Sequence, residues 1–467
     1  MAVHTQHPVS APPAAPPRER TGVLLLRAWC VVVLFTTITG TAWVLAVGEV
    51  GAALIGAGTA LVSAVIWLTT RPPVQWRRLP WFVLAYVTFA AASLLWTAWP
   101  ATTLLTVALM LVTTFQGLFV AATLTWQELV RAVASACKWV VALSLAFELW
   151  VSVFIGGPLL PRFIVPERPA PDPIVYWSRD NLFDGGRIQG IFGNANLLAY
   201  AALFALIVFA IRYAARAPHR PLLLGWMAAA LYLFVRAGSA TAYVAAALVL
   251  VVLTTVLLMR TTRRPGERTR YYVVYAAVAL GGLAAAWLLR DRVFSLLGRS
   301  SDLTGRETIW ATVLARAAER PVAGWGFATP WLPWDPAFDG WIVDHGETVM
   351  QAHNMWLDVY LQLGGVGVVL MATTYLAFVW RSWFFAVDRP RWDLRADRPY
   401  SPLTLLPTLT GAVLLVQGLA ESGPLLLWGW LAVVMFAFKI KQAPLVGVGP
   451  AEQTLALERG ELPQRAE

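Results

Sequence analysis

Charged residues are scarce in this chain, because Asp, Glu, Lys and Arg together make up only 13% of its 467 residues. Water-soluble domains carry about a quarter of their residues as charged side chains, so this composition excludes a soluble globular protein. Apolar residues make up 58% of the chain and gather in long runs. The sequence therefore predicts an all-α polytopic membrane protein.

Lysine and cysteine are also nearly absent. The net charge of +10 comes almost entirely from arginine, and these arginines lie in short loops between apolar runs. That distribution is typical of membrane topology and argues against nucleic-acid binding. Cys30 and Cys137 both lie inside apolar runs, which favours buried small side chains over a disulfide or a metal pair.

Hydropathy predicts about twelve membrane spans. A large polar loop, residues 290–353, separates the ninth span from the tenth. Gly364, Gly365 and Gly367 in the tenth span favour close helix packing. The predicted spans cover residues 28–47, 50–70, 80–98, 101–123, 131–155, 194–211, 221–236, 239–259, 271–289, 354–380, 403–419 and 423–438.

Arginine in alternate short loops predicts the orientation of these spans in the cytoplasmic membrane. With both termini in the cytoplasm, the two long loops at 156–193 and 290–353 lie outside. We expect residues 1–22 and 442–467 to form disordered cytoplasmic tails. Residues 23–441 then form the membrane domain.

Two groups of arginine and asparagine lie on the predicted outer side. Arg187 stands among glycines, and Asn194 and Asn196 follow at the start of the sixth span. Arg306 lies in the first turn of a predicted amphipathic helix at 305–319. Guanidinium groups and a helix N-terminus favour anions, and the alternative is a topology charge with an ordinary asparagine cap.

The third candidate group enters the tenth span. His353 lies at the membrane boundary, where a neutral imidazole accepts a proton near neutral pH. Asn354 and Asp358 share one helix face, and an Asp within a span is a functional candidate. Asp358 or Glu347 would orient the imidazole. The alternative for His353 is interfacial packing.

Aromatic residues crowd the large loop. Trp325, Trp331, Trp334 and Trp341 all lie in residues 290–353. Two interpretations remain open. The loop lies on the membrane surface with the rings at the interface, or some rings, Trp325 among them, stack on sugar faces.

Three motifs in this order resemble the superfamily of O-antigen ligases and polymerases. They are R-x-x-G-x-F-x-N-x-N from Arg187, G-R-x-x-x-W followed by P-x-x-G-W-G, and H-N-x-x-L-D followed by Q-x-G-G-x-G. The family usually has proline at Ala195 and an arginine at Ala240. We hypothesise that Arg236, four residues before Ala240, supplies the missing charge.

The resemblance implies a membrane glycosyltransferase that moves a glycan from a polyprenyl-diphosphate donor to a hydroxyl on a glycan, lipid or protein. It implies Arg187, Arg306 and His353 as catalytic groups. Arg236, Asn194, Asn196, Asn354, Asp358 and Trp325 would bind substrate. The outer loops contain no D-x-D pair, so we expect neither a metal nor another cofactor.

Two alternatives to a ligase remain open. A polymerase of the same superfamily would join the glycan to another lipid-linked repeat, and the sequence does not distinguish these two enzymes. A transporter of polyprenyl-linked glycans predicts charges in the middle of spans, whereas this chain has few and concentrates its polar residues outside.

Overall fold

The computed structural model describes residues 21–161, 163, 172–262, 266–288, 306–344, 346–388 and 400–442. Most of the two predicted tails lies outside these ranges. At their inner edges, Thr21 and Gly22 belong to the first helix and Gln442 ends the last one.

The described chain is helical apart from one two-stranded antiparallel hairpin, which confirms the predicted fold class. The elements are α1 Thr21–Ile38, α2 Gly40–Thr70, α3 Trp81–Ala92, α4 Pro100–Thr123, α5 Trp126–Trp150, α6 Ala195–Ala214, α7 Arg220–Ala237, α8 Ala240–Thr261, α9 Glu267–Leu288, α11 Arg306–Ala318, β1 Val343–Asp344, β2 Glu347–Thr348, α12 Met355–Val387, α13 Leu405–Ala420 and α14 Leu427–Gln442. Short π or 3₁₀ turns include η2 Ser93–Leu95, η3 Val151–Ile155, η5 Gly190–Phe192, η7 Pro402–Thr404 and η8 Gly423–Leu425.

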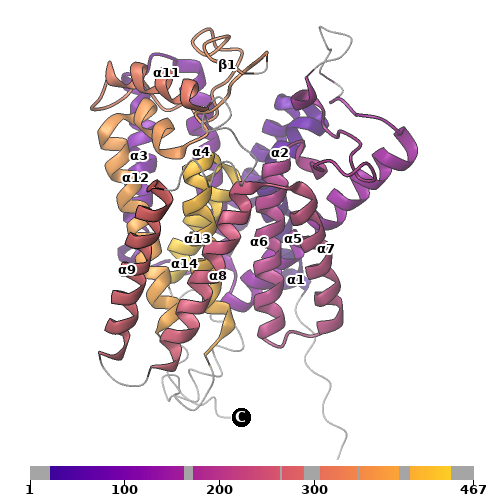
Figure 1. Cartoon of the computed structure of the whole chain (residues 1–467), viewed down its shortest axis with the longest axis vertical. Helices are drawn as coiled ribbons and strands as arrows, with labels where there is room; N and C mark the ends of the chain where they lie inside the picture. Colours follow the sequence, from indigo (N-terminus) through magenta and orange to yellow (C-terminus); the bar gives the residue numbers. More distant parts are fainter. Residues whose placement is uncertain are drawn as a thin grey trace, which may run out of the picture.

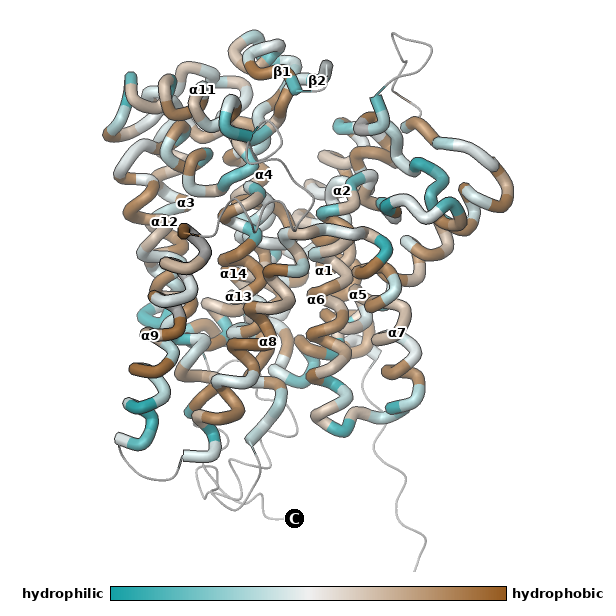
Figure 2. The backbone as a smooth tube through the Cα atoms, viewed as in Figure 1, coloured by the Kyte–Doolittle hydropathy of each residue, from teal (hydrophilic) through white to brown (hydrophobic). Residues whose placement is uncertain are grey.

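Nine helices in the described part of the chain are long and apolar enough to cross a membrane. The chain is therefore a multi-span membrane protein, and Figure 2 shows the apolar middle of the bundle between more polar ends. The other predicted spans coincide with α3, α9 and α14, which do not reach that length or apolar content over their described residues.

Two glycines interrupt long helices. Gly48 adopts φ 78° and ψ 171° inside α2, at the boundary predicted between the first two spans. Gly364 adopts φ 61° and ψ −162° inside α12, so the tenth predicted span is divided into a short helix before Gly364 and a long one after it. Hydropathy missed this break because both halves are apolar.

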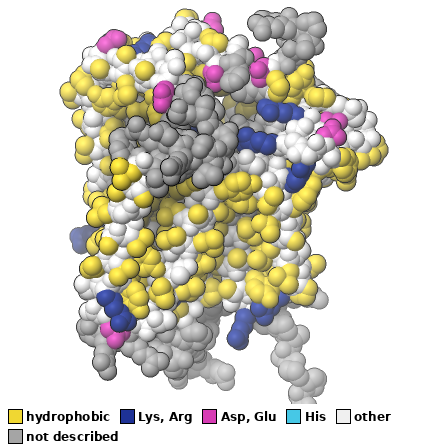
Figure 3. Space-filling model, viewed as in Figure 1, with side chains coloured by type: hydrophobic (Ala, Val, Ile, Leu, Met, Phe, Trp, Pro, Cys, Tyr) yellow, Lys and Arg dark blue, Asp and Glu magenta, His cyan; other side chains and the backbone are white. Residues whose placement is uncertain are grey.

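The loops predicted to be cytoplasmic meet at one end of the bundle. The backbone N–H of Gln75 donates to the side-chain oxygen of Gln442 at 2.9 Å, and the side-chain nitrogen of Gln442 donates to the Gln75 carbonyl at 2.8 Å. Arg260 donates to the Ala386 carbonyl at 2.8 Å, and Arg268 pairs with Asp388. Figure 3 shows Lys and Arg at this lower end, below a broad apolar belt. This grouping is what the arginine count predicts.

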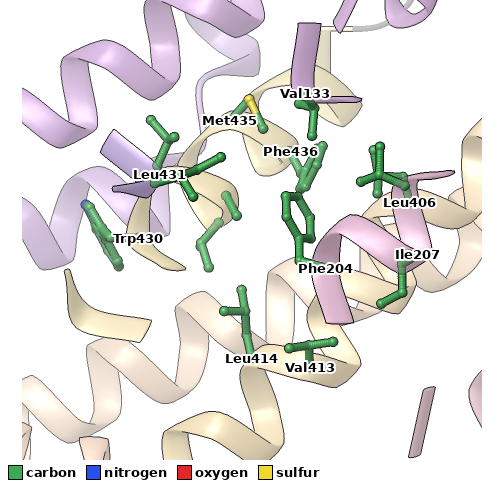
Figure 4. Packing of buried hydrophobic residues seen from close by; sticks show 14 of the residues in the cluster. Val133, Phe204, Ile207, Leu406, Val413, Leu414, Trp430, Leu431, Met435 and Phe436 are labelled. Carbon is green, nitrogen blue, oxygen red and sulfur yellow. The ribbon is translucent and has the colours of Figure 1, made fainter. Parts of the chain in front are cut away.

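The segment that carries α11, β1 and β2 lies at the opposite end, above α3 and α4 (Figure 1). Between the two ends, α5, α6, α13 and α14 pack a continuous apolar core. In Figure 4, Phe204, Leu414, Leu431 and Phe436 lie close together, and all are buried. The upper ends of α6 and α13 are thereby held in fixed positions, and both contribute side chains to the site.

Candidate active site

The site begins where the segment of residues 306–354 attaches to the break in α12. Backbone hydrogen bonds join Gly365 N to the Pro321 carbonyl at 2.8 Å and Gly326 N to the Gln362 carbonyl at 2.8 Å. The fully buried Gln362 side chain adds bonds to both backbone groups of Ala328, at 3.1 and 3.0 Å. The P-x-x-G-W-G motif thus fastens the segment to α12.

Only glycine fits at two positions of this attachment, because the neighbouring backbone leaves no space for a side chain. A Cβ at Gly324 would lie 2.4 Å from the Gln362 carbonyl group, and one at Gly364 would lie 2.4 Å from that of Val322. Both glycines also have positive φ, which other residues rarely adopt. Gly364 does allow a close approach, but its partner is the loop at Val322, so the predicted packing of one helix against another is wrong for this glycine.

The centre of the site is the carboxylate of Glu421, which follows α13 and is 8% exposed. Its Oε1 accepts hydrogen bonds from Arg306 Nη2 and Asn196 Nδ2, each at 3.2 Å. Its Oε2 accepts one from Gln351 Nε2 at 3.1 Å and lies 2.9 Å from His353 Nδ1. One carboxylate thus joins all three predicted groups.

His353 is held in an unusual backbone conformation. Its φ is 49°, a left-handed value that costs a non-glycine residue roughly 1–3 kcal/mol and is concentrated at functional sites. The side chain remains 29% exposed. Because Nδ1 faces Glu421, Nε2 is the ring nitrogen left without a hydrogen-bond partner among the described residues.

The neighbours of His353 determine its tautomer. Gln351 Oε1 accepts a hydrogen bond from Ser422 N at 3.1 Å, so the amide group of Gln351 is turned with its Nε2 toward Glu421. The carboxylate only accepts hydrogen bonds, and therefore Nδ1 of a neutral His353 carries the proton. Nε2 then holds the free lone pair, as in a base oriented by a carboxylate.

Arg187 and Arg306 reach this centre from different parts of the chain. Arg306 donates to the Ala420 carbonyl at 2.9 Å as well as to Glu421. Arg187 donates to Asn196 Oδ1 at 2.7 Å and to the Ala237 carbonyl at 2.7 Å. We call Arg187, Asn196, Arg306, Gln351, His353 and Glu421 the Glu421 cluster.

The cluster sets the charge of its carboxylate. Burial by itself would raise the pKa of Glu421, but the hydrogen bond and charge of His353 and the charge of Arg306 outweigh burial and lower the pKa below its ordinary 4.5. Glu421 is therefore ionised at neutral pH. It stabilises a positive charge on the imidazole.

Part of this chain matches a known protein family. Residues 191–372 match the family model described as O-antigen ligase. This chain carries an O-antigen ligase domain. No curated protein matches the chain. The family comprises ligase- and polymerase-type transferases of glycans in membranes.

The matched region of the ligase domain contains Asn196, Arg306, Gln351 and His353, whereas Arg187 precedes it and Glu421 follows it. The Glu421 cluster is therefore completed by residues outside the matched region. Within the described ranges, no three His, Cys, Asp or Glu side chains gather as a metal site.

Two predicted substrate-binding asparagines are helix caps. Asn194 Oδ1 accepts from the N–H groups of Asn196 and Leu197 at the start of α6. Asn354 does the same at the start of α12, with Trp356 N at 2.9 Å. The cap alternative given for Asn194 is thus observed, and Asn354 caps its helix in the same way, so the two caps orient the helices that carry Asn196 and Asp358.

Asp358 is fully buried and does not contact the imidazole through a hydrogen bond. Its Oδ2 accepts from Ala352 N at 3.1 Å and from the Ser422 hydroxyl. It therefore holds the peptide before His353 against the start of η8. The orienting carboxylate at Nδ1 is Glu421, and Glu347 lies exposed on β2.

Arg236 and Trp325 lie outside the Glu421 cluster. Arg236 donates to the carbonyls of Asn181 and Leu182 at 2.6 and 3.0 Å. The Trp325 ring stacks on Trp99 with centroids 6.3 Å apart and has the Arg320 guanidinium 4.0 Å from its centroid. Substrate binding by either residue stays a prediction.

The other loop tryptophans differ in burial. Trp331 is buried, parallel to Phe338 with ring centroids 5.9 Å apart, and 5.0 Å from Trp341. Trp334 is 49% exposed. Part of this aromatic group is therefore a small core of the 306–354 segment, which neither interpretation foresaw.

Sequence analysis missed Glu421, Gln351 and Ser422. Residues 420–422 form a short loop without Lys or Arg, so the pattern of arginines in the loops does not single out the carboxylate there. Its signal was present: an acidic residue between two apolar spans, on the side predicted to hold Arg187 and Arg306, indicates a counter-charge.

Proposed function

We propose that this protein transfers a glycan from a polyprenyl-diphosphate donor to a hydroxyl acceptor at the outer face of the cytoplasmic membrane. The observation that carries the proposal is the shared carboxylate of Glu421, which holds His353 on Oε2 and Arg306 on Oε1. A base and an anion-binding group thereby stand on two sides of one fixed carboxylate.

His353 acts as the general base. Nε2 accepts the proton of the acceptor hydroxyl as the acceptor oxygen forms its bond to the anomeric carbon of the glycan. The bond between that carbon and the diphosphate oxygen breaks, and its electron pair leaves with the lipid diphosphate. Glu421 stabilises the imidazolium that results.

Arg306 and Arg187 neutralise the leaving diphosphate. A diphosphate is already a good leaving group, so charge stabilisation serves it better than protonation. With His353 neutral, the Glu421 cluster contains two guanidinium groups and one carboxylate, a net charge of 2 − 1 = +1. Donor binding adds negative charge to a site that carries a positive excess. We propose that this reaction needs no metal.

The same proposal includes the topology. Twelve crossings would place α11, the β hairpin and the Glu421 cluster outside, between the ninth and tenth crossings, with both termini in the cytoplasm. The meeting of the arginine-rich loops at the opposite end of the bundle supports this orientation. Membrane lipid then surrounds the apolar belt in Figure 3.

The test is transfer by the purified full-length protein in lipid nanodiscs, given a defined polyprenyl-diphosphate glycan and a hydroxyl acceptor. His353→Ala is expected to abolish product, while the exposed Glu319→Gln, on the same segment, leaves it unchanged. Equal product from wild type and His353→Ala would remove the imidazole from the mechanism. Extension of lipid-linked repeats without another acceptor would identify a polymerase, and movement of donor without transfer would identify a transporter.

A further inference from the structure

Another buried carboxylate, Glu148, takes no part in the reaction proposed above. Glu148, in the last turn of α5, is 1% exposed. A buried carboxylate costs several kcal/mol unless hydrogen bonds satisfy its oxygens. Here they do: Oε1 accepts from Gln189 N at 2.8 Å and Gly190 N at 2.6 Å, and Oε2 accepts from the Ser178 hydroxyl at 2.9 Å.

The two N–H groups belong to the turn that follows Arg187. Gly190 has φ 54°, and a Cβ there would lie 2.8 Å from Ser144 Oγ and 2.9 Å from Leu198 Cδ1. The turn therefore rests directly on α5, without space for a side chain. Ser144 and Glu148 are one helical turn apart, so they form one face of α5 beneath the turn.

Further hydrogen bonds hold the backbone at Arg187 and at the residue after it. Its carbonyl accepts from Asn181 Nδ2 at 2.9 Å, a contact on the exposed side of the loop. The next residue, Ile188, donates its N–H to the Arg236 carbonyl at 3.2 Å. Glu148 is a charged group that holds this turn from the buried side. The first N–H that it binds belongs to Gln189, two residues after Arg187.

We propose that Glu148 is a positioning residue for Arg187. Its carboxylate fixes the turn at Gln189 and Gly190, so that the Arg187 guanidinium reaches Asn196 Oδ1 and the donor diphosphate. This inference rests on the proposed function. Glu148 touches no substrate, and its effect on transfer passes through Arg187.

The experiment measures kcat and the donor KM of the full-length protein with a defined polyprenyl-diphosphate glycan. Glu148→Gln retains an oxygen for both N–H groups, and its amide nitrogen donates to the Ser178 hydroxyl, so it is expected to keep wild-type KM. Glu148→Leu removes all three bonds. A displacement of about 1 Å costs on the order of 10²-fold in rate, and we expect a loss of that size in kcat/KM, mainly through the donor KM. Glu148→Asp, one methylene too short to reach both N–H groups, should show a smaller loss in the same direction.

Two controls separate positioning from a general loss of structure. Ser144→Ala alters the same face of α5 without removing a carboxylate bond and should behave as wild type. In an Arg187→Ala background, Glu148→Leu is expected to add no further loss, because residues that act through one group are not additive. Additive losses, or a fall in kcat with the donor KM unchanged, would overturn the inference.

The same assay distinguishes this inference from the proposed function. If His353→Ala abolishes transfer while Glu148→Leu and Glu148→Asp keep the wild-type donor KM, the inference alone fails. If His353→Ala remains active, the proposed function fails first. Should Glu148→Leu not fold, the comparison of Glu148→Asp with Glu148→Gln decides the matter, since Gln has the size and shape of glutamate and Asp keeps the carboxylate on a side chain shorter by one methylene.

Discussion

The substitution Glu421→Gln distinguishes the roles of the two oxygens of the Glu421 carboxylate, because it keeps an oxygen on one side and places an amide nitrogen on the other. Arg306 is always charged and donates to the position of Oε1, where Asn196 also donates. A glutamine at 421 must therefore place its carbonyl oxygen on that side, because an amide nitrogen there would face two donors. The amide nitrogen then faces His353 Nδ1 and Gln351 Nε2.

This orientation inverts the tautomer of His353. The glutamine amide donates to Nδ1, so the neutral imidazole carries its proton on Nε2, and the lone pair that would accept the acceptor proton is lost. Replacing the carboxylate that orients a catalytic histidine by its amide lowers kcat by about 10⁴ in a well-studied triad. We expect a fall in kcat on the order of 10³–10⁴ here, equivalent to ~4–5.5 kcal/mol. The donor KM should change little, because Arg306 keeps its acceptors.

The assay is the initial rate of transfer in nanodiscs, measured as a function of donor and acceptor concentration. Arg306→Ala serves as the contrasting variant, because it should raise the donor KM. Glu319→Gln is the matched carboxylate-to-amide control at an exposed position in the turn after α11. A kcat for Glu421→Gln within about tenfold of wild type, ~1.4 kcal/mol, would refute the assignment of the tautomer.

Four further predictions follow from the same structure. Because the folded protein lowers the pKa of Glu421, the ionised group stabilises the fold at neutral pH. That stability should decline as the pH falls below the ordinary pKa of 4.5 and through the lower folded value, so the Tm of wild type should drop more steeply than that of Glu421→Gln. Gly364→Ala is expected to lower the Tm strongly, because its Cβ would meet the Val322 carbonyl group at 2.4 Å. Gly365→Ala, whose nearest neighbour is 3.4 Å away, should not. Arg236→Ala should reduce transfer if Arg236 supplies the charge missing at Ala240, and full activity would end that hypothesis. Transfer should persist in EDTA, and its loss with recovery on adding Mg²⁺ would contradict a metal-independent reaction.

Local sequence determined the helical membrane fold, the position of the break at Gly48, and the α11 helix at Arg306–Ala318. These features depend on apolar run length and on residues near one another in the chain, so a single sequence contains them. The sequence also identified Arg187, Arg306 and His353 as candidates, since each stands beside a span on the same predicted side. Their roles in transfer stay predictions.

Tertiary structure alone decided which group joins those candidates. Glu421 follows His353 by 68 residues and Arg306 by 115, and the packing of α13 between α6, α8 and α12 brings its end to both. The break at Gly364 also depends on a distant partner, because the Val322 backbone occupies the space that a side chain would need. Hydropathy and motif spacing describe neighbours along the chain, whereas the charge and tautomer of His353 depend on a neighbour that only folding supplies.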